Sequence, residues 1–297
     1  VANGILLREN IFDNIWIQPA AGDAGGALGA ALSAWYLHHN NERKISPQGD
    51  TMKGSYLGPE YSDAEIEQDL KSCGAIFKKC SEAQLIEEVA TALTDEKAIG
   101  WMQGRMEFGP RALGGRSIIA DPRSPAMQKQ LNLKVKYRES FRPFAPSILY
   151  EDVAEWFENK TDSPYMLLVA DVQKNKRQAM TVEEKALFGI DKLNIARSSV
   201  PAITHVDYSA RIQTVHADTN ARYHAVISRF KEKTTCPIVV NTSFNVRGEP
   251  IVCSPIDAFK CFMGTDLDIL AVGNYLLLKK EQDEKLIEDY KERYELD

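Results

Sequence analysis

The sequence has few of the groups that form disulfides or metal sites. Its 297 residues include five cysteines, and no two of them form a CxxC pair. They are Cys73, Cys80, Cys236, Cys253 and Cys261. Because their spacing matches no common zinc finger, we expect buried free thiols in a reducing compartment rather than a zinc site.

Several familiar catalytic and targeting signatures are also missing. The chain has no GxxxxGK[ST] phosphate loop and no Ser-His-Asp nucleophile motif, which argues against a P-loop kinase and a simple hydrolase. Of the five histidines, only His205 beside Asp207 is placed like a site residue. We find no secretory signal and no apolar run of membrane-spanning length, so we expect a cytoplasmic protein without a membrane partner.

Charge is acidic overall but basic in one segment. The 36 Lys and Arg stand against 42 Asp and Glu, and the net charge of -6 argues against a protein coated in nucleic acid. Residues 101–147 reverse this balance. Their basic residues are Arg105, Arg111, Arg116, Arg123, Lys129, Lys134, Lys136, Arg138 and Arg142, and their acidic ones are Glu107, Asp121 and Glu139.

Two regions can be separated along the chain. Residues 1–20 are apolar and β-prone, AGDAGGALGAALSAWYLHH is typical of a small-residue helix, and residues 39–61 are polar enough for a linker. We place a first region at 1–45 and a second domain at 46–297. The chain opens within an apolar run and has no initiator Met, so we expect a piece of a longer protein.

Helices and strands intermix in the second region, which predicts an α/β fold with a mixed sheet. Capping boxes are expected at Ser62 and Ser81, and further helices after Ser124, around Tyr223 and after Ser254. KAIGWMQ, CPIVV and ILAVGNYLLLK have the apolar, β-prone composition of strands. The final run KKEQDEKLIEDYKERYELD is typical of a docked surface helix.

Four polar clusters follow or separate the predicted strands, and each contains at least one arginine. They are GRMEFGPRALGGRS, NLKVKYRESFRPFAPS, THVDYSARIQTV and VVNTSFNVRGEP. Arginine forks and backbone N–H groups freed by glycine bind phosphate or carboxylate, so four clusters together indicate a shared polyanionic ligand. Taken singly, each cluster is also compatible with a solvated basic face or a plain turn. In an extended KVKYR segment, Lys136 and Arg138 would point to the same side.

These four motifs, in this order, resemble the C-terminal half of the NodU/CmcH family of O-carbamoyltransferases. AGDAGGALGAAL also resembles the last motif of that family's first, actin-like domain. The resemblance implies a YrdC-like three-layer domain, with a twisted mixed sheet flanked by helices, after a short actin-like fragment. It also implies that the YrdC-like domain makes carbamoyl adenylate from carbamoyl phosphate and ATP, with Mg2+, for transfer to a substrate hydroxyl.

The resemblance assigns roles to particular residues. It implies that Lys136, Arg142 and Arg111 are catalytic and contact carbamoyl phosphate and nucleotide phosphates. The substrate-binding residues that it implies are Arg138, Arg211, Arg247, Ser209, Asn241, Ser243 and Asn245. Asp23 resembles a carboxylate ligand of an iron site whose other ligands lie in the missing N-terminal domain, so we expect Fe2+ in the complete protein only.

Two positions depart from the family pattern, and several questions stay open. Gly115 stands where Asn is common, and Tyr208 stands where a Gly is common. An RNA-binding YrdC-like module and a catalytically inactive nucleotide-binding domain are the alternative functions. The acceptor, of sugar, nodulation factor or antibiotic type, and the oligomeric state, including a homodimer, are not fixed by the sequence.

Overall fold

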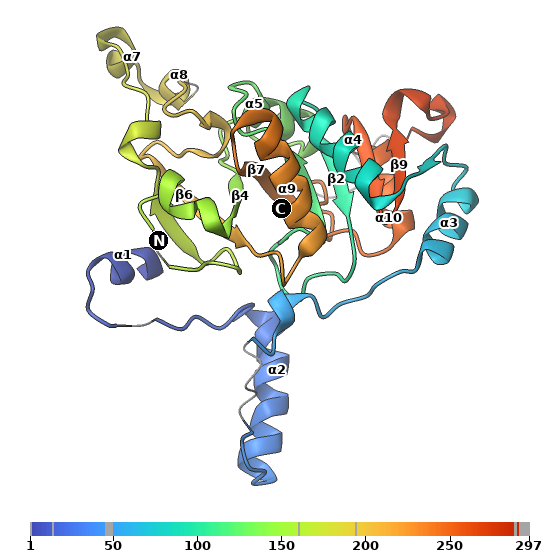
Figure 1. The fold of residues 1–297 in the computed structure, drawn as a ribbon, viewed down its shortest axis with the longest axis horizontal. Helices are drawn as coiled ribbons and strands as arrows, with labels where there is room; N and C mark the ends of the chain where they lie inside the picture. Colours follow the sequence, from blue (N-terminus) through green and yellow to red (C-terminus); the bar gives the residue numbers. More distant parts are fainter. Residues whose placement is uncertain are drawn as a thin grey trace.

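A computed structural model describes residues 2–13, 15–44, 50–159, 161–193, 195–287 and 290 (Figure 1). Its centre is a nine-stranded sheet in the order β1-β9-β8-β2-β3-β7-β4-β6-β5. The strands are β1 Lys78–Lys79, β2 Ile99–Met102, β3 Arg116–Ala120, β4 Ala145–Leu149, β5 Leu168–Asp171, β6 Ser209–Val215, β7 Ile238–Ser243, β8 Ile269–Val272 and β9 Tyr275–Leu278. The pairs β2/β8 and β4/β6 are parallel and the others antiparallel, which confirms the predicted mixed sheet.

Helices cover both faces of the sheet, which confirms the expected α/β class. In Figure 1, α4 and α9 lie together in front of the sheet and α10 lies behind it. The helices are α1 Ala2–Arg8, α2 Asp23–Ser33, α3 Asp63–Ser72, α4 Glu82–Thr94, α5 Met127–Gln130, α6 Val153–Trp156, α7 Val182–Ala186, α8 Gly189–Leu193, α9 Ala221–Thr234 and α10 Pro255–Met263. The apolar core between these layers includes Trp101, Tyr223, Phe230 and Phe262.

Local signals in the sequence located the helices α3, α4, α9 and α10. Both predicted capping boxes are formed, by Ser62 with Glu65 and by Ser81 with Gln84. Ser254 caps α10, and the helix around Tyr223 is α9. These side chains satisfy backbone N–H groups that the first helical turn leaves unpaired.

Two local predictions were wrong. Residues 2–8 form the helix α1 rather than a strand, and α1 packs against β5, with Gly4 next to the carbonyl of Val169. KVKYR is not extended, because a π-helical turn at Leu131–Val135 runs into Lys136 and Tyr137 has a φ of +47°. In both places contacts distant in sequence outweigh the local pattern.

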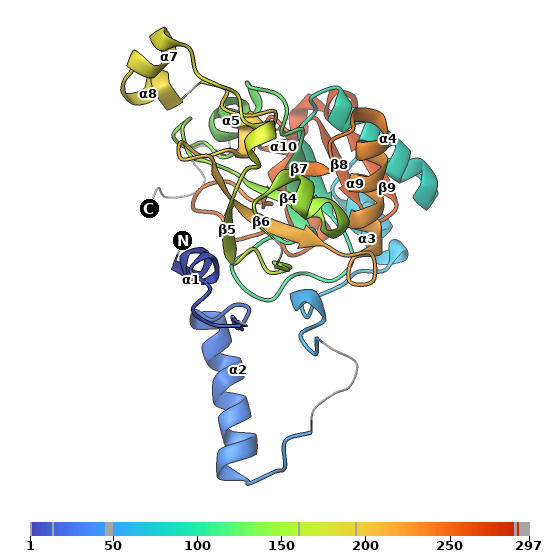
Figure 2. The same ribbon diagram turned by 60° about the vertical axis from the view of Figure 1, so that its left-hand side comes forward.

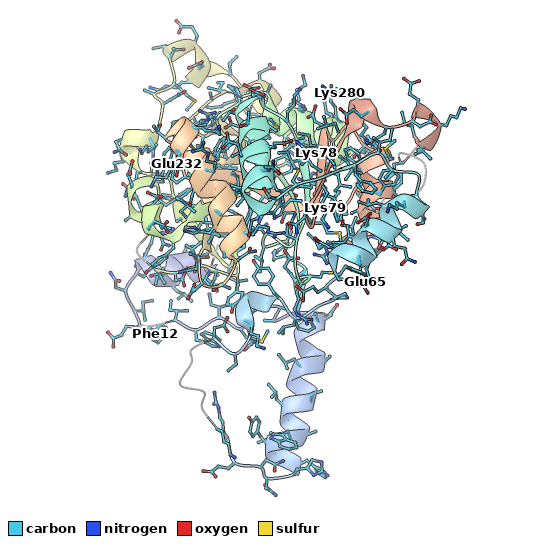
Figure 3. The ribbon with its side chains drawn as sticks, turned by 45° about the vertical axis from the view of Figure 1, so that its right-hand side comes forward. Phe12, Glu65, Lys78, Lys79, Glu232 and Lys280 are labelled. Carbon is cyan, nitrogen blue, oxygen red and sulfur yellow. The ribbon has the colours of Figure 1, made fainter. Side chains whose placement is uncertain are left out.

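The segment that carries α2 stands away from the body of the protein (Figures 2 and 3). The helix has no buried residue, and its Leu32 is exposed. Trp35 and Leu37, in the π-helical turn Ala34–His38 that follows α2, are exposed as well. Figure 3 also shows Phe12, which is 61% exposed, on the chain between α1 and α2.

The end of the chain was expected to be a surface helix. Its described part contains two short 3-10 turns, Lys279–Glu281 and Glu284–Leu286. The rest of that prediction, including Tyr294, lies outside the described residues. None of the helices in the ranges given above is long and apolar enough to cross a membrane.

Candidate functional site

Three neighbouring strands bring predicted site residues to one face of the sheet. Asn241 of β7 lies opposite Ala145 of β4. On the other side of β4, Ser147 pairs with Gln213 of the parallel strand β6. Arg211, two residues before Gln213, therefore points to the same face, so that Asn241 and Arg211 flank the small side chain of Ala145.

The loop between β2 and β3, residues 103–115, folds around one buried carboxylate. Glu107 Oε1 accepts hydrogen bonds from the backbone N–H groups of Leu113 at 2.6 Å, Gly115 at 2.7 Å and Arg116 at 3.2 Å. Glu107 was not among the predicted site residues, although a single acidic residue among glycines and arginines is a signal for such a structural carboxylate. The carboxylate fixes the loop that carries Arg111.

Two of the three arginines in this stretch serve the fold. The guanidinium of Arg116 is buried and donates to the carbonyls of Gln103, Gly104, Gly115, Pro59 and Cys253. Arg105 is exposed, pairs with Glu60 at 3.4 Å and donates to the Gly58 carbonyl. Arg111 is the remaining arginine, and its position is different.

Arg111 lines a cavity of about 170 Å³ together with residues from the other three clusters. The lining consists of Pro110, Arg111, Ala112, Arg138, Pro143, Phe144, Ala145, Met166, Arg211, Asn241, Thr242 and Ser243. Arg111, Arg138, Arg211, Asn241 and Ser243 were all predicted as site residues. We call this space the arginine cavity.

The cations in and beside the arginine cavity repel one another. Burial and the nearby Arg111 lower the pKa of Arg211 to about 10. Burial and the nearby Arg142 lower the pKa of Arg138 to about 10, even though its Nε donates to Asn132 and its guanidinium lies 5.0 Å from the ring of Phe144. An anion in the cavity would relieve this repulsion and restore both pKa values.

Lys136 was predicted to contact substrate, but in this structure its amine points into protein. Nζ donates to the Ser243 carbonyl, to the Asn245 carbonyl at 2.8 Å, to Asn245 Oδ1 at 2.9 Å and to Ser243 Oγ at 3.3 Å. Burial and Arg138 lower the pKa of Lys136 to about 7, whereas these acceptors favour its charged form. Lys136 and Asn245 thus hold the chain around Ser243, which lines the arginine cavity.

Arg142 and Arg247 lie beside the arginine cavity rather than on its wall. Both contact Glu139, at 3.0 Å from Arg142 Nε and at 3.6 Å from Arg247 Nη1. Arg142 is near enough to Arg138 to lower the pKa of that guanidinium. Both side chains are therefore candidates to contact the part of a ligand that extends out of the cavity.

Ser209 lies at the start of β6, and its hydroxyl is already used. Ser209 Oγ donates to Asp207 Oδ1 at 2.6 Å, and the backbone N–H of Ser209 donates to the same oxygen. The preceding Tyr208 has a φ of +64°, a conformation that favours glycine, and Arg177 lies over its ring at 5.0 Å. The departure from glycine thus falls at a position where glycine would be less strained.

Gly115 is the second departure, and it has little room. A Cβ at this position would lie 2.8 Å from the Arg105 carbonyl and 3.1 Å from the Glu107 carboxylate. An Asn here would require the loop to move. The glycine therefore leaves room for the hydrogen bonds that the loop makes to Glu107.

Asp23 is the first residue of the projecting helix α2 (Figure 2) and does not line the arginine cavity. In the described ranges no group of three or more His, Cys, Asp or Glu side chains is arranged to hold a metal ion. Asp23 alone does not make an iron site.

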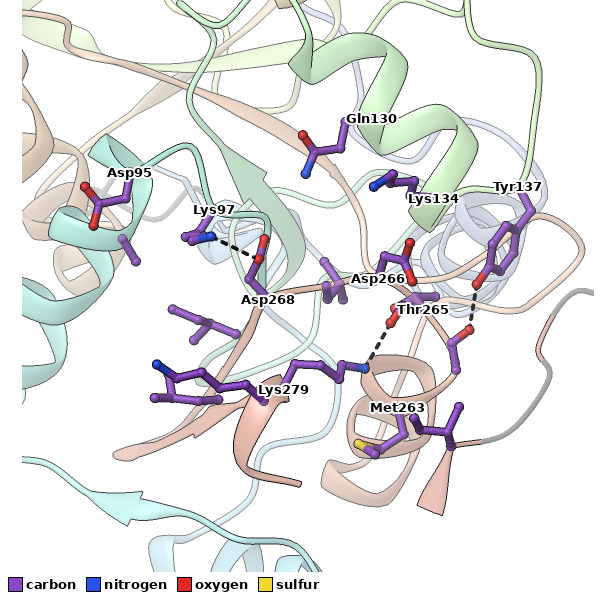
Figure 4. Close-up of a pocket in the computed structure, with 17 residues that line it drawn as sticks. Asp95, Lys97, Gln130, Lys134, Tyr137, Met263, Thr265, Asp266, Asp268 and Lys279 are labelled. Carbon is purple, nitrogen blue, oxygen red and sulfur yellow. Dashed lines mark hydrogen bonds and ion pairs between the residues drawn. The ribbon is translucent and has the colours of Figure 1, made fainter. Parts of the chain in front are cut away.

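A larger hollow of about 1020 Å³ lies at the end of the sheet where the parallel strands β2 and β8 begin (Figure 4). Its polar wall includes Lys97, paired with Asp268 at 3.5 Å, and Lys279, which donates to the Thr265 carbonyl at 2.9 Å. Burial lowers the pKa of Lys279 to about 8. None of the predicted site residues lines this hollow.

Comparison with known proteins identifies the family to which the chain belongs. The family model "Carbamoyltransferase C-terminus" matches residues 90–279, and "Carbamoyltransferase N-terminus" matches residues 1–32. The uncharacterized protein sll1178 of Synechocystis sp. is 57% identical over an alignment of 304 residues, which covers all of this chain and 49% of that protein.

Two nodulation proteins are similar over 94% of this chain. NolNO of Sinorhizobium fredii is 43% identical and NolO of Bradyrhizobium diazoefficiens is 40% identical, with 38% and 47% of those proteins covered. The chain thus spans half or less of the length of these relatives. Among solved structures, full-length HypF in its phosphate- and nucleotide-bound form is similar with a TM-score of 0.41 and 17% identity, over 68% of this chain and 22% of that one.

Proposed function

Since the chain belongs to the carbamoyltransferase family, we propose that it carries the part of an ATP-dependent O-carbamoyltransferase that makes carbamoyl adenylate. The family match confirms the resemblance read from the four motifs. The observation that supports the reaction is the arginine cavity, where Arg111, Arg138 and Arg211 surround a space of about 170 Å³. That volume suits a small phosphorylated compound better than a whole nucleotide.

The proposed reaction joins two phosphorylated substrates. Water releases phosphate from carbamoyl phosphate, and an oxygen of the resulting carbamate attacks the α-phosphorus of ATP and displaces pyrophosphate. Carbamoyl phosphate, ATP and water thus give carbamoyl adenylate, phosphate and pyrophosphate. A substrate hydroxyl would then attack the carbamoyl carbon, give its proton to a base and release AMP. We propose a small-molecule hydroxyl, of sugar or antibiotic type, as this acceptor.

The cations would act mainly by position and charge. Arg111, Arg138 and Arg211 would bind the phosphate of carbamoyl phosphate, and Arg142 and Arg247 would meet ATP phosphates at the edge of the arginine cavity. Fixed cations lower the cost of bringing two anions together and stabilise charge at the transferred group. Lys136 and Asn245 would keep Ser243 in place on the wall.

Metal ions would not be held by the wall of the arginine cavity. Its residues include no Asp or Glu, so they do not fit a magnesium site made by protein carboxylates. We therefore propose that Mg2+ arrives with the phosphates of ATP, as part of that substrate.

The proposal is tested by incubating the chain with ATP, Mg2+ and carbonyl-labelled carbamoyl phosphate. We expect pyrophosphate release that depends on both substrates, together with a labelled adenylate. Reactions that omit carbamoyl phosphate are the control for plain ATP hydrolysis. Salt-sensitive RNA binding without pyrophosphate release would favour the RNA-binding alternative, and ATP binding without any release would indicate an inactive domain.

A further inference from the structure

Two buried polar atoms of residues that line the arginine cavity have no hydrogen-bond partner. They are Oδ1 of Asn241 and Nε of Arg211. Within the described ranges only two other buried side-chain atoms, Tyr223 OH and Asn274 Oδ1, are in this state. Buried polar atoms are nearly always paired, because an unpaired one loses its hydration without compensation. A ligand in the cavity with both an acceptor and a donor would be able to pair with these two atoms.

The orientation of the Asn241 amide is set by its other end. Nδ2 donates to Gln213 Oε1 at 2.8 Å, to the Ala112 carbonyl at 3.0 Å and to Ser147 Oγ at 3.0 Å. Gln213 is itself fixed, because its Nε2 donates to the Leu113 carbonyl at 2.7 Å. The amide cannot be reversed without placing its oxygen against these acceptors, so Oδ1 stays an unpaired acceptor.

The two unpaired atoms belong to strands on either side of β4. Ala145 stands between Asn241 and Arg211 and projects only a methyl group from the sheet. Neighbouring strands are about 4.8 Å apart, so a small ligand lying across β4 can reach towards both side chains. Such a ligand needs an anionic end for the arginines and an N–H or O–H group at the other end.

We propose that Asn241 is the residue that selects a carbamoyl group, by accepting a hydrogen bond from the carbamoyl NH2 through Oδ1. This inference rests on the proposed function, since it assumes that carbamoyl phosphate occupies the arginine cavity. Acetyl phosphate has the same shape and charge but carries a methyl group in place of NH2. It would leave Oδ1 unpaired and should bind at least about tenfold more weakly.

The test is a calorimetric titration of the chain with carbamoyl phosphate and with acetyl phosphate, at low temperature and fixed ionic strength. The readout is the ratio of the two dissociation constants. In Asn241→Leu, which removes the acceptor and keeps a similar volume, the ratio should fall to about one. Gln213→Leu is the matched control, because Gln213 does not line the cavity and Asn241 Nδ2 keeps its bonds to the Ala112 carbonyl and Ser147 Oγ in this variant. It should weaken both ligands while keeping the preference.

Each outcome bears on one of the two claims. Equal binding of both phosphates by the unaltered chain overturns the role of Asn241, whether or not Asn241→Leu folds. A preference that persists in a folded Asn241→Leu chain also overturns it. If the folded chain binds neither phosphate, the proposed function fails and this inference falls with it, whereas equal binding with normal pyrophosphate release leaves the proposed function standing.

Discussion

At the scale of single residues, the arginines differ in what their guanidinium groups already contact. Arg116 is enclosed by carbonyls, and Arg105 pairs with Glu60 at the surface. Arg111, Arg138 and Arg211 instead share the arginine cavity, where Arg111 repels Arg211 and the neighbouring Arg142 repels Arg138. Sequence spacing could not separate these two groups, because it shows neither the carbonyls nor the cavity.

Removing one cavity arginine should therefore cost more binding than removing a surface one. We expect Arg138→Ala to weaken carbamoyl phosphate binding by about tenfold to a hundredfold, since a charge-assisted contact to an anion is lost. The matched control is Arg105→Ala, which removes the same group outside the cavity and should change affinity by less than about twofold. Titration calorimetry on both variants measures the difference, and equal losses would place the anion elsewhere.

A second prediction at this scale concerns the backbone at Tyr208. Because φ is +64°, Tyr208→Gly should be more stable than Tyr208→Ala by about 1 kcal/mol, the reverse of the usual order. Both variants lose the contact of the ring with Arg177, so that loss cancels in the comparison. Thermal unfolding of the two variants measures the order, and a more stable Ala variant would show that the conformation is not kept.

At the scale of elements, the sequence predicted well where the local pattern agreed with the tertiary contacts. Capping boxes and apolar spacing located α3, α4, α9 and α10, and β-prone runs located β2 and β7. Prediction failed at KVKYR, where Lys136 binds Ser243 and Asn245, and Tyr137 donates to the Gly264 carbonyl. Those contacts join residues more than 100 positions apart, so no local pattern could show them.

The four clusters predicted which residue types lie together better than they predicted the local backbone conformation. Arg111, Arg138, Arg211, Asn241 and Ser243 meet because strand order brings β7, β4 and β6 together. The sequence could supply these residue types but not their directions. Lys136 and Asn245 were grouped with the ligand-binding residues, and the contact between them could not be seen in the sequence.

Helices α4 and α9 provide a pH-dependent contact at the element scale. Hydrogen bonds from Arg229 at 2.5 Å and Lys233 at 2.6 Å, both on α9, lower the pKa of Glu87 on α4 to about 2. The lowered pKa means that this contribution to stability is complete above the ordinary pKa of 4.5 and is lost as pH falls towards 2.

We therefore expect Glu87→Gln to lower the melting temperature slightly at neutral pH and low salt. The difference from the unaltered chain should shrink as pH falls below 4.5, and also as salt is added, because Glu87 is exposed. Melting curves across pH 2 to 7 test this expectation. A difference that grows towards low pH would mean that the glutamate acts through packing instead.

At the scale of the whole molecule, the sheet and the segment before residue 45 differ in how they are held. The strands share one buried core, whereas α2 buries none of its residues. The segment contacts the body through α1, where Asn3 donates a long hydrogen bond to the Leu167 carbonyl and Arg8 donates one to the Val169 carbonyl. It also contacts the body through residues 17–22, which line a hollow together with Arg111. The arginine cavity itself is built only from residues after 109.

A shortened chain of residues 50–297 should therefore fold and keep the anion site. Asp50 would still accept hydrogen bonds from the N–H groups of Met52 and Gly54, so the new start keeps its own turn. We expect a melting temperature within about 5 °C of that of the 297-residue chain, and less aggregation, because the exposed Trp35 and Leu37 are removed.

Carbamoyl phosphate affinity should stay within about threefold, since the cationic lining is intact. Differential scanning calorimetry and titration on the same preparation measure both quantities. A large loss of affinity without loss of stability would show that residues 17–22 position Arg111, and the first region would then belong to the site.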